Sequence, residues 1–362
     1  MPLNHYVTLG RSGLRVSPFC LGAMTFGEEW GWGAPVAESF AMLSRFLERG
    51  GNFIDTANGY TRGHSESIIG DFFARDRSQR DRVVVATKFF TNLNPGDPNG
   101  GGASRKAIVA SCEQSLRRLQ TDYIDLYWMH AWDKFTPIDE TMRTLDDLVQ
   151  SGKVRYVGFS DTPAWKVAQA QVLAQLRGWT PLVALQIEYS LLERTVEGEL
   201  VPMALELGLG VTPWSPLGSG VLSGKYTREN AQEAKPGRGE RVKARLSERA
   251  FGILDELQRI ATKHEVAVAP VALAWLLRKA GVASVIIGAR TVVQLAQNLA
   301  AFDVALDGED MAALDAVSVP TLSFPAAFLG GMANMIMHGG ATVNGEASAR
   351  WPMAPGSDAD RY

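Results

Sequence analysis

Short apolar runs alternate with longer runs of helical spacing along most of this sequence of 362 residues. The short runs are rich in β-branched side chains, which is typical of strands. We predict eight strands, at residues 19–24, 51–55, 82–88, 123–130, 154–160, 181–190, 209–215 and 283–290. Strands this apolar belong to a parallel sheet that is covered on its outer face. Eight such units favour an α/β fold closed into a (β/α)₈ TIM barrel, with an open doubly wound sheet as the alternative.

The segments between the strands predict the rest of the fold. The sequences VTLG and LRVS flank RSG near the N-terminus and indicate a β-hairpin before the barrel. Ser104 suits the N-cap position of a helix. Residues 91–104 are rich in Gly, Pro and Asn and indicate a long loop, and the polar residues 225–245 indicate a mobile surface loop. Helices are predicted at 36–50, 65–75, 104–120, 139–150, after Pro163 and at 291–301.

Residues 319–362 do not follow the alternation of strands and helices. They are apolar yet rich in Gly and Pro, and they are too hydrophobic for a simple linker. We therefore expect residues 1–318 to form the barrel and residues 319–362 to form a C-terminal extension. The extension is expected to pack on the barrel or on a partner, which leaves a homo-oligomer open.

Composition and charge exclude several classes of function. The net charge is −3 at pH 7 without a basic stripe, which gives no indication of a nucleic-acid partner. Cys20 and Cys112 are far apart, so a reducing compartment fits, and no Cys/His set has zinc spacing, so no metal is expected. Neither a signal peptide nor an apolar window of membrane-spanning length is present, so we expect a cytoplasmic protein without a membrane partner.

Polar side chains of complementary type end three of the predicted strands. Asp55 ends the second strand and Tyr60 lies in the loop after it, while Lys88 ends the third strand and His130 the fourth. The C-terminal strand ends of such a barrel form one mouth, so all four side chains are expected to project toward it. Singly, each has an ordinary alternative: a helix cap, a packed tyrosine, a solvated lysine or a core histidine. The combination favours a catalytic site.

Together these groups can form a proton donor. An isolated tyrosine has a pKa near 10, about 3 units or roughly 4 kcal/mol from neutral pH. The ammonium of Lys88 favours the phenolate and so lowers the pKa of Tyr60, while Asp55 keeps Lys88 charged and oriented. His130 can hydrogen-bond a substrate oxygen. Such a set suits a carbonyl that is becoming an alcohol.

No Gly-rich phosphate motif follows a predicted strand. The segment GSGVLSGK at 218–225 has Ser223 at the third glycine position of a dinucleotide fingerprint. It also misses a P-loop, because Ser219 and Tyr226 occupy the positions of the first glycine and the final Ser/Thr. A Rossmann domain and a P-loop nucleotidase are therefore disfavoured.

Up to about residue 317 the sequence resembles the aldo-keto reductase family, in its bacterial NADP-dependent oxidoreductase type. The resemblance implies that Tyr60 is the general acid, that Asp55 and Lys88 tune it, and that His130 orients the carbonyl. It also implies that NADPH lies extended across the barrel mouth. The motifs that carry it are LGAMTFG, NFIDTANGY, VVVATK, DYIDLYWMH, VRYVGFSD, LQIEYSLLER, TPWSPLGSGVLSGKY and IIGARTVVQLAQN.

The resemblance further implies which residues contact the cofactor. Ser160, Asp161 and Gln186 would hold the nicotinamide carboxamide, and Trp214 would stack on the nicotinamide ring. Asp161 stands where many family members carry Asn, and a carboxylate can accept from the carboxamide NH₂ but cannot donate to its oxygen. Residues implied for the pyrophosphate are Ser215, Leu217 and Ser219, and those for the 2′-phosphate and adenosine are Gly288, Arg290, Gln294, Gln297 and Asn298. Two roles stay open for Lys225: it helps to bind phosphate, or it is a solvated loop charge.

Aromatic residues in the loops after the strands are expected to form the walls of a substrate pocket, unless they pack against the C-terminal extension. Such a pocket would suit an aldehyde or ketone with apolar bulk. The candidates are Trp30, Trp32, Phe89, Phe90 and Trp132.

Three functions are compatible with these residues. NADPH-dependent, reversible reduction of an aldehyde or ketone to an alcohol accounts for the whole set. A regulatory subunit that binds the cofactor with little turnover would share the cofactor residues. A Schiff-base aldolase or lyase would use Lys88 as its nucleophile, but it does not explain Arg290 or Trp214.

Overall fold

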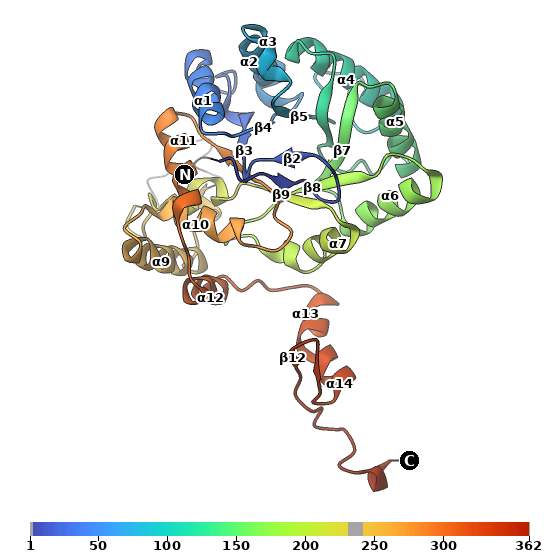
Figure 1. The fold of residues 1–362 in the computed structure, drawn as a ribbon, viewed down its shortest axis with the longest axis vertical. Coiled ribbons are helices and arrows are strands. Elements are labelled where there is room, and N and C mark those ends of the chain that lie inside the picture. Colours follow the sequence, from blue (N-terminus) through green and yellow to red (C-terminus); the bar gives the residue numbers. More distant parts are fainter. Residues whose placement is uncertain (1–2, 231–241, 362) are drawn as a thin grey trace.

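The computed structural model describes residues 3–230 and 242–361. In its body, eight strands form one sheet in which every neighbouring pair is parallel (Figure 1). Each predicted strand overlaps an observed one. The strands are β3 (Phe19–Gly22), β4 (Phe53–Asp55), β5 (Val84–Phe89), β6 (Ile124–Met129), β7 (Val154–Ser160), β8 (Leu182–Glu188), β9 (Gly210–Trp214) and β10 (Val285–Gly288).

The sheet closes where its first and last strands meet. In the strand order β10–β3–β4–β5–β6–β7–β8–β9, the two ends are β10 and β9. The N–H of Val211 donates to the carbonyl of Gly281 at 2.9 Å, and the N–H of Ala283 donates to the carbonyl of Val211 at 2.9 Å. These bonds join β9 to the segment that leads into β10. The prediction of a (β/α)₈ barrel is confirmed.

Helices surround the barrel and cover its outer face (Figure 1). The predicted N-cap Ser104 is observed, because its hydroxyl accepts from the N–H of Ala107 at 3.3 Å. Two helices between β9 and β10, α9 and α10, were not predicted. The principal helices are α1 (Val36–Glu48), α2 (His64–Ala74), α4 (Arg105–Leu119), α5 (Ile138–Gln150), α6 (Ala164–Arg177), α7 (Leu200–Leu207), α9 (Glu248–Lys263), α10 (Val268–Leu277), α11 (Val292–Leu299) and α12 (Gly308–Val317).

The helix α10 is apolar on all sides and buried from residue 268 to residue 276. No single helix within residues 3–230 and 242–361 is long and apolar enough to cross a membrane. The helices α9 and α10 pass that test only as a pair, and they meet at an angle of 97°.

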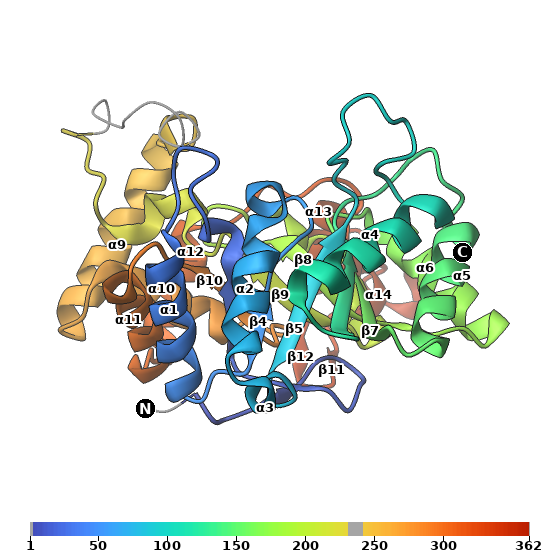
Figure 2. The ribbon, with the colours of Figure 1, turned by 90° about the horizontal axis from the view of Figure 1, so that it is seen from above.

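The barrel interior is filled by side chains from alternate strand positions. Phe53, Ala86, Leu126 and Trp128 belong to one interior cluster. The predicted hairpin, formed by β1 (Val7–Thr8) and β2 (Arg15–Val16), is confirmed and covers the N-terminal end of the barrel. Figure 2 shows the hairpin at the end opposite the long loop between β5 and α4. The C-terminal end, called the mouth below, is therefore the open one.

Two predicted loops have different outcomes. Residues 91–104 contain no helix or strand, as expected, and all of them are described. The predicted mobile loop at 225–245 falls largely on residues 231–241, which lie outside the described residues.

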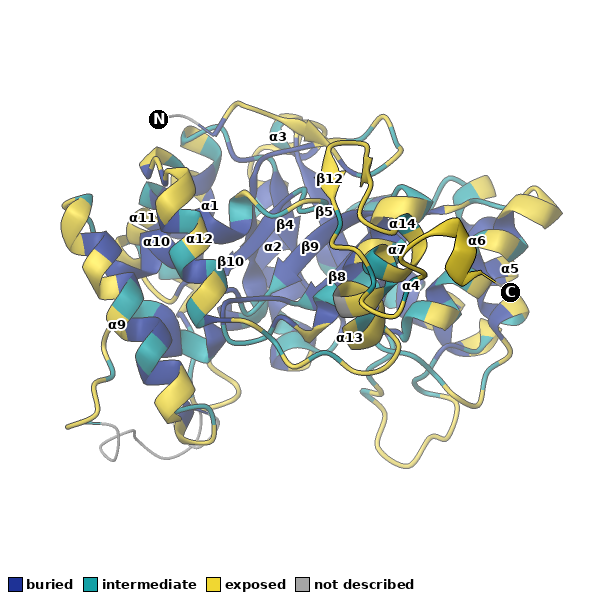
Figure 3. Cartoon of the chain, turned by 90° about the horizontal axis from the view of Figure 1, so that it is seen from below, coloured by how far each residue is buried: buried dark blue, intermediate teal, exposed yellow. Residues whose placement is uncertain are grey.

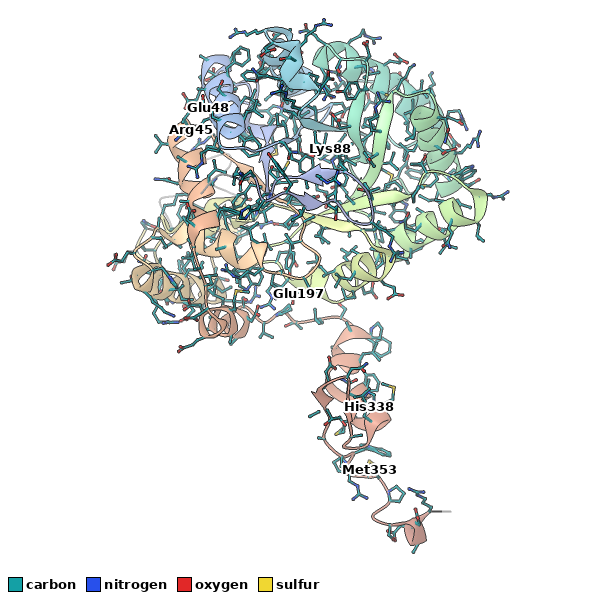
Figure 4. The ribbon with its side chains drawn as sticks, viewed as in Figure 1. Arg45, Glu48, Lys88, Glu197, His338 and Met353 are labelled. Atoms are coloured by element: carbon teal, nitrogen blue, oxygen red, sulfur yellow. The ribbon has the colours of Figure 1, made fainter. Side chains whose placement is uncertain are left out.

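The C-terminal extension runs away from the barrel (Figure 1). It consists of α13 (Ala326–Phe328), a π-helical turn (Leu329–Ala333), α14 (Asn334–His338) and a small hairpin of β11 (Thr342–Val343) with β12 (Glu346–Ala347). In Figure 4 the labelled His338 and Met353 lie on it, far from Lys88 inside the barrel. Its expected packing on the barrel or on a partner stays a prediction.

We predict that Gly158→Ala destabilises the barrel. A Cβ atom at Gly158 would lie 2.4 Å from the Trp128 ring and 2.9 Å from the carbonyl oxygen of Ala184. Overpacking of this kind costs about 1–3 kcal/mol, so thermal unfolding should occur several degrees lower. Gly13→Ala is the matched control, because a Cβ atom there meets nothing within 4 Å. Equal melting temperatures for the two variants would contradict the prediction.

Candidate active site

The interior side chains at the mouth form one polar layer. Asp55 ends β4, Lys88 lies one residue before the end of β5, and His130 directly follows β6. Ser160 ends β7, and Gln186 lies near the end of β8. Because side chains of a strand alternate between its two faces, Lys88 points inward as Ala86 does. The structure thus brings together the strand-end residues that the sequence singled out.

The ammonium of Lys88 is buried and fully paired. Its Nζ atom donates to Oδ1 of Asp55, to the carbonyl oxygen of Thr56 at 2.8 Å and to the hydroxyl of Tyr60 at 3.2 Å. The Lys88 side chain is 0% exposed and that of Asp55 is 2% exposed. An ammonium has three hydrogens, so all of them are used. Lys88 is therefore held in one position against the Tyr60 oxygen.

The loop after β4 is held by hydrogen bonds that place Tyr60. The N–H groups of Thr56 and Asn58 donate to the carbonyls of Ala86 and Lys88, each at 2.9 Å, and so extend the pairing of β4 with β5. Tyr60 then opens a 3₁₀ turn, with its N–H directed to the carbonyl of Ala57 at 3.2 Å. The phenol reaches the mouth because these bonds fix its backbone.

The pKa of Tyr60 lies above its ordinary value, contrary to the sequence expectation. Burial raises the pKa of Tyr60, and the nearby charge of Lys88 lowers it by less. For Lys88, burial lowers the pKa, but Asp55 and Tyr60 raise it more, so the Lys88 pKa lies above its ordinary value. The expected sign of the Lys88 effect is right, but it does not outweigh burial. At neutral pH the layer holds a neutral phenol beside a charged ammonium.

His130 lies beside Tyr60 as a neutral imidazole. The two ring centroids are 5.6 Å apart, with an angle of 80° between the ring planes. Burial, together with the charge of Lys88, lowers the pKa of His130 to about 3. A neutral imidazole has one N–H donor and one acceptor nitrogen, so it can bind an uncharged substrate oxygen. No cluster of His, Cys, Asp and Glu in the described residues has the arrangement of a metal site.

The residues expected at the carboxamide surround the base of the mouth. The hydroxyl of Ser160 is buried and has no partner among the described residues, which is unusual for a buried polar atom. Gln186 donates from Nε2 to Oδ2 of Asp55 at 3.1 Å. The indole N–H of Trp214 donates to Oδ1 of Asp161 at 3.0 Å. An orphaned hydroxyl with amide and carboxylate neighbours fits a planar carboxamide, which both donates and accepts.

The loop after β9 carries the residues expected at the pyrophosphate. Ser215 and Ser219 have positive φ values of 51° and 60°, and the Ser215 hydroxyl accepts from the N–H of Ser219 at 3.0 Å. Leu217 precedes a 3₁₀ segment, and Lys225 is exposed with its Nζ close to Gly220. Left-handed turns and an adjacent ammonium suit a pyrophosphate.

The residues expected at the 2′-phosphate and adenosine lie on α11 and in the segment before it. Thr291 caps the helix, and the exposed Arg290 has its N–H bound to Oε1 of Gln294 at 2.9 Å. Asn298 donates from Nδ2 to the carbonyl of Gly288 at 3.2 Å, whereas Gln297 is exposed. An exposed arginine at a helix N-terminus suits a phosphate.

The sequence profile of the aldo/keto reductase family matches residues 18–319. The chain belongs to this family. The uncharacterized oxidoreductase YrpG of Bacillus subtilis is 42% identical over 314 residues, which cover 84% of this chain and 93% of the relative. The aryl-alcohol dehydrogenase GME11368 of Pestalotiopsis microspora and norsolorinic acid reductase B of Dothistroma septosporum are each 37% identical, over 334 and 336 residues, which cover 90% of this chain and 85% of each relative.

Membership of the aldo/keto reductase family implies an oxidoreductase that acts on carbonyl groups of small molecules. The family generally uses nicotinamide cofactors. The side chains described above fit such a cofactor, because the mouth offers partners for an amide, for phosphates and for an aromatic ring.

Aromatic side chains gather at the mouth of this aldo-keto reductase. The Trp30 ring lies 6.4 Å from the Tyr60 ring and 5.5 Å from that of Trp32. On the other side, the ring of Trp132 lies 5.6 Å from that of Trp165. The sequence analysis missed Trp165, which follows strand β7 in the segment TPAW as Trp132 follows β6, so the same signal was available for it.

Phe89 does not line the mouth, so its assignment to the pocket is corrected. The residue is fully buried in the layer between barrel and helices, with its ring 5.0 Å from that of Tyr127. Adjacent residues of a strand face opposite sides, so an inward Lys88 requires an outward Phe89.

We predict that nicotinamide cofactor binding weakens as the pH falls through about 6. Desolvation at the mouth raises the pKa of Asp161 to about 6, against the hydrogen bond from Trp214. The ionised carboxylate would accept from the expected carboxamide, so protonation below that pKa would remove an acceptor. Asp161→Asn should bind with less change in affinity between pH 5 and pH 8, measured by titration calorimetry. Identical pH profiles for the two proteins would refute this role of Asp161.

Proposed function

We propose that this aldo-keto reductase catalyses the NADPH-dependent, reversible reduction of an aldehyde or ketone to an alcohol, with Tyr60 as general acid. The observation that carries the proposal is the 3.2 Å contact between the Tyr60 hydroxyl and the buried Lys88 ammonium. When bound, the cofactor supplies the hydride that adds to the carbonyl carbon. Tyr60 donates its proton to the carbonyl oxygen, so that the product is a neutral alcohol.

The surrounding residues support this proton transfer. A phenol that loses its proton becomes an anion, and Lys88 is placed to stabilise that anion as it forms. Asp55 keeps Lys88 charged, since the two side chains form a buried ion pair. The neutral His130 can donate to the carbonyl oxygen and hold it near Tyr60. Tyr60 and His130 therefore act on the carbonyl oxygen of the substrate, and Lys88 and Asp55 act through Tyr60.

Preference for NADPH over NADH rests on Arg290. An arginine can form two parallel hydrogen bonds to a phosphate, which only the 2′-phosphorylated cofactor offers at this position. Arg290 is exposed and directly precedes Thr291, the N-cap of α11, so it is available for such a contact.

The substrate is proposed to be an aromatic aldehyde or ketone. Flat apolar surfaces that suit an aromatic ring are supplied by Trp30, Trp32, Trp132 and Trp165. One of the relatives is named as an aryl-alcohol dehydrogenase, which agrees with this class.

The two other functions are less well supported. A Schiff base needs a neutral amine with a free lone pair, but the Lys88 pKa is raised and its three hydrogens are engaged. A regulatory subunit with little turnover would not need the ordered contacts between Lys88, Tyr60 and Asp55.

Tyr60→Phe should lower the turnover number by about 10²–10⁴-fold, the usual range for loss of a general acid. Binding of NADPH should stay within about twofold, since the hydroxyl acts on the substrate oxygen and not on the cofactor. Tyr6→Phe is the matched control, because Tyr6 is an exposed tyrosine whose hydroxyl donates to the carbonyl of Gly50. Steady-state assays with a panel of aromatic and aliphatic carbonyl compounds measure the turnover number and the apparent affinity for NADPH. An unaltered turnover number in Tyr60→Phe would contradict the assignment of Tyr60 as general acid.

Arg290→Met should weaken NADPH binding by about 10–100-fold and leave NADH binding unchanged, because charge-assisted hydrogen bonds contribute roughly 1.5–3 kcal/mol. Arg117→Met changes another exposed arginine, on α4, and should affect neither cofactor. Fluorescence titration with both cofactors gives the four affinities. Equal losses of affinity for NADPH and NADH would show that Arg290 does not bind the 2′-phosphate.

A further inference from the structure

The C-terminal extension exposes its apolar side chains to solvent. No described residue from 319 to 361, here called the arm, is buried (Figure 3). Within the described residues, nine of the twenty exposed large apolar side chains belong to the arm. Single domains rarely expose so much contiguous apolar surface, so the arm needs a surface that covers it. The nine are Val319, Phe324, Phe328, Leu329, Met332, Ile336, Met337, Val343 and Met353.

The chemistry of the arm points to a protein surface. Residues 319–345 contain no Asp, Glu, Lys or Arg. A helix that binds at a membrane surface carries Lys and Arg on its polar face, and a nucleic-acid site also requires basic residues. Three methionines between residues 332 and 337 give the arm side chains that adapt to irregular apolar surfaces.

A matching apolar surface lies on two neighbouring helices of the barrel. On α6, Trp165, Val172 and Leu176 are 59%, 51% and 78% exposed, and their spacing of seven and four residues puts them on one face. On the adjacent α7, Leu205 is 50% exposed. These four residues are called the α6–α7 patch.

The arm leaves the body at one end of this patch without covering it. A cleft there is lined by Trp165 and Leu200 of the body and by Phe324 and Ala326 of the arm. Beyond this point the arm runs outward (Figure 1). The hydrogen bonds described for residues 320–361 all have their partners within the same segment. One chain therefore presents both an uncovered arm and an uncovered patch.

We propose that two copies of the chain form a two-fold dimer in which the arm of each packs on the α6–α7 patch of the other. A closed two-fold interface uses the same surfaces twice, and the emergence of the arm beside the patch allows this reciprocity. A stable interface takes about 20–30 residues from each partner, which the arm and the patch together provide. Both surfaces are mainly apolar. Residues 319–345 contain no Asp, Glu, Lys or Arg, and the Lys166 ammonium beside the patch lies over the Trp165 ring, 4.6 Å from its centroid.

The first experiment measures the mass of the full chain by sedimentation equilibrium. The wild type should have twice the chain mass of 39.3 kDa. Leu176→Glu on the patch and Ile336→Glu on the arm should each raise the dimer dissociation constant by at least about tenfold, because each buries a charge in an apolar contact. Val109→Glu, on an exposed valine of α4, is the control and should stay dimeric. Circular dichroism melting verifies that each variant is folded.

The second experiment mixes the two weakened variants. In the proposed dimer, a Leu176→Glu chain keeps an unmodified arm and an Ile336→Glu chain keeps an unmodified patch. One of the two contacts is then restored, so the mixture should form mixed dimers more tightly than either variant alone. Native mass spectrometry separates the species. A monomeric wild type, dimers that both variants leave intact, or a mixture that gains no association would overturn the proposal.

Discussion

A buried ammonium is the constraint on which the active site of this barrel depends. An unpaired charge at the fully buried position of Lys88 would cost several kcal/mol. Its three acceptors, on Asp55, Thr56 and Tyr60, all come from the short segment 55–60, which begins at the last residue of β4. Because Lys88 requires all three acceptors, residues 55–60 adopt a single arrangement. The contacts that make the buried charge tolerable are therefore the ones that place the phenol.

The same burial decides how the phenol behaves. Desolvation raises the pKa of Tyr60 more than Lys88 lowers it, so the group is protonated at neutral pH. For a proton donor this is the useful state before reaction, and the stabilisation from Lys88 is strongest for the anion that forms afterwards. His130 lies beside the same amine, which helps to keep the imidazole neutral by lowering its pKa. Burial thus sets the protonation states of both neighbours, with Lys88 opposing it at Tyr60 and reinforcing it at His130.

The sequence predicted the parts of the fold that repeat and the groups that end strands. Eight apolar runs specify a barrel, and a polar residue after an apolar run marks the mouth, as at Asp55, Lys88 and His130. The pocket assignment of Phe89 failed because side chains alternate between the two faces of a strand. Phe89 follows the inward Lys88 and so faces outward. The helix α10 was also missed, because a helix that is apolar on all sides has no amphipathic period to detect. The pKa of Tyr60 depends on a balance of burial and charge, and the spacing of residues in the sequence does not give the distances that set this balance.

The end of the family match and the end of the buried core coincide. The profile match ends at residue 319, and Ser318 is the last buried residue among those described. Up to that point most of the large apolar side chains are buried in the barrel and its helices, whereas no described residue beyond it is buried. The α6–α7 patch includes Trp165, whose ring packs against Trp132 at the mouth. A surface that covers the patch would therefore also restrain an aromatic wall of the substrate site, which links assembly to substrate binding through one pair of rings.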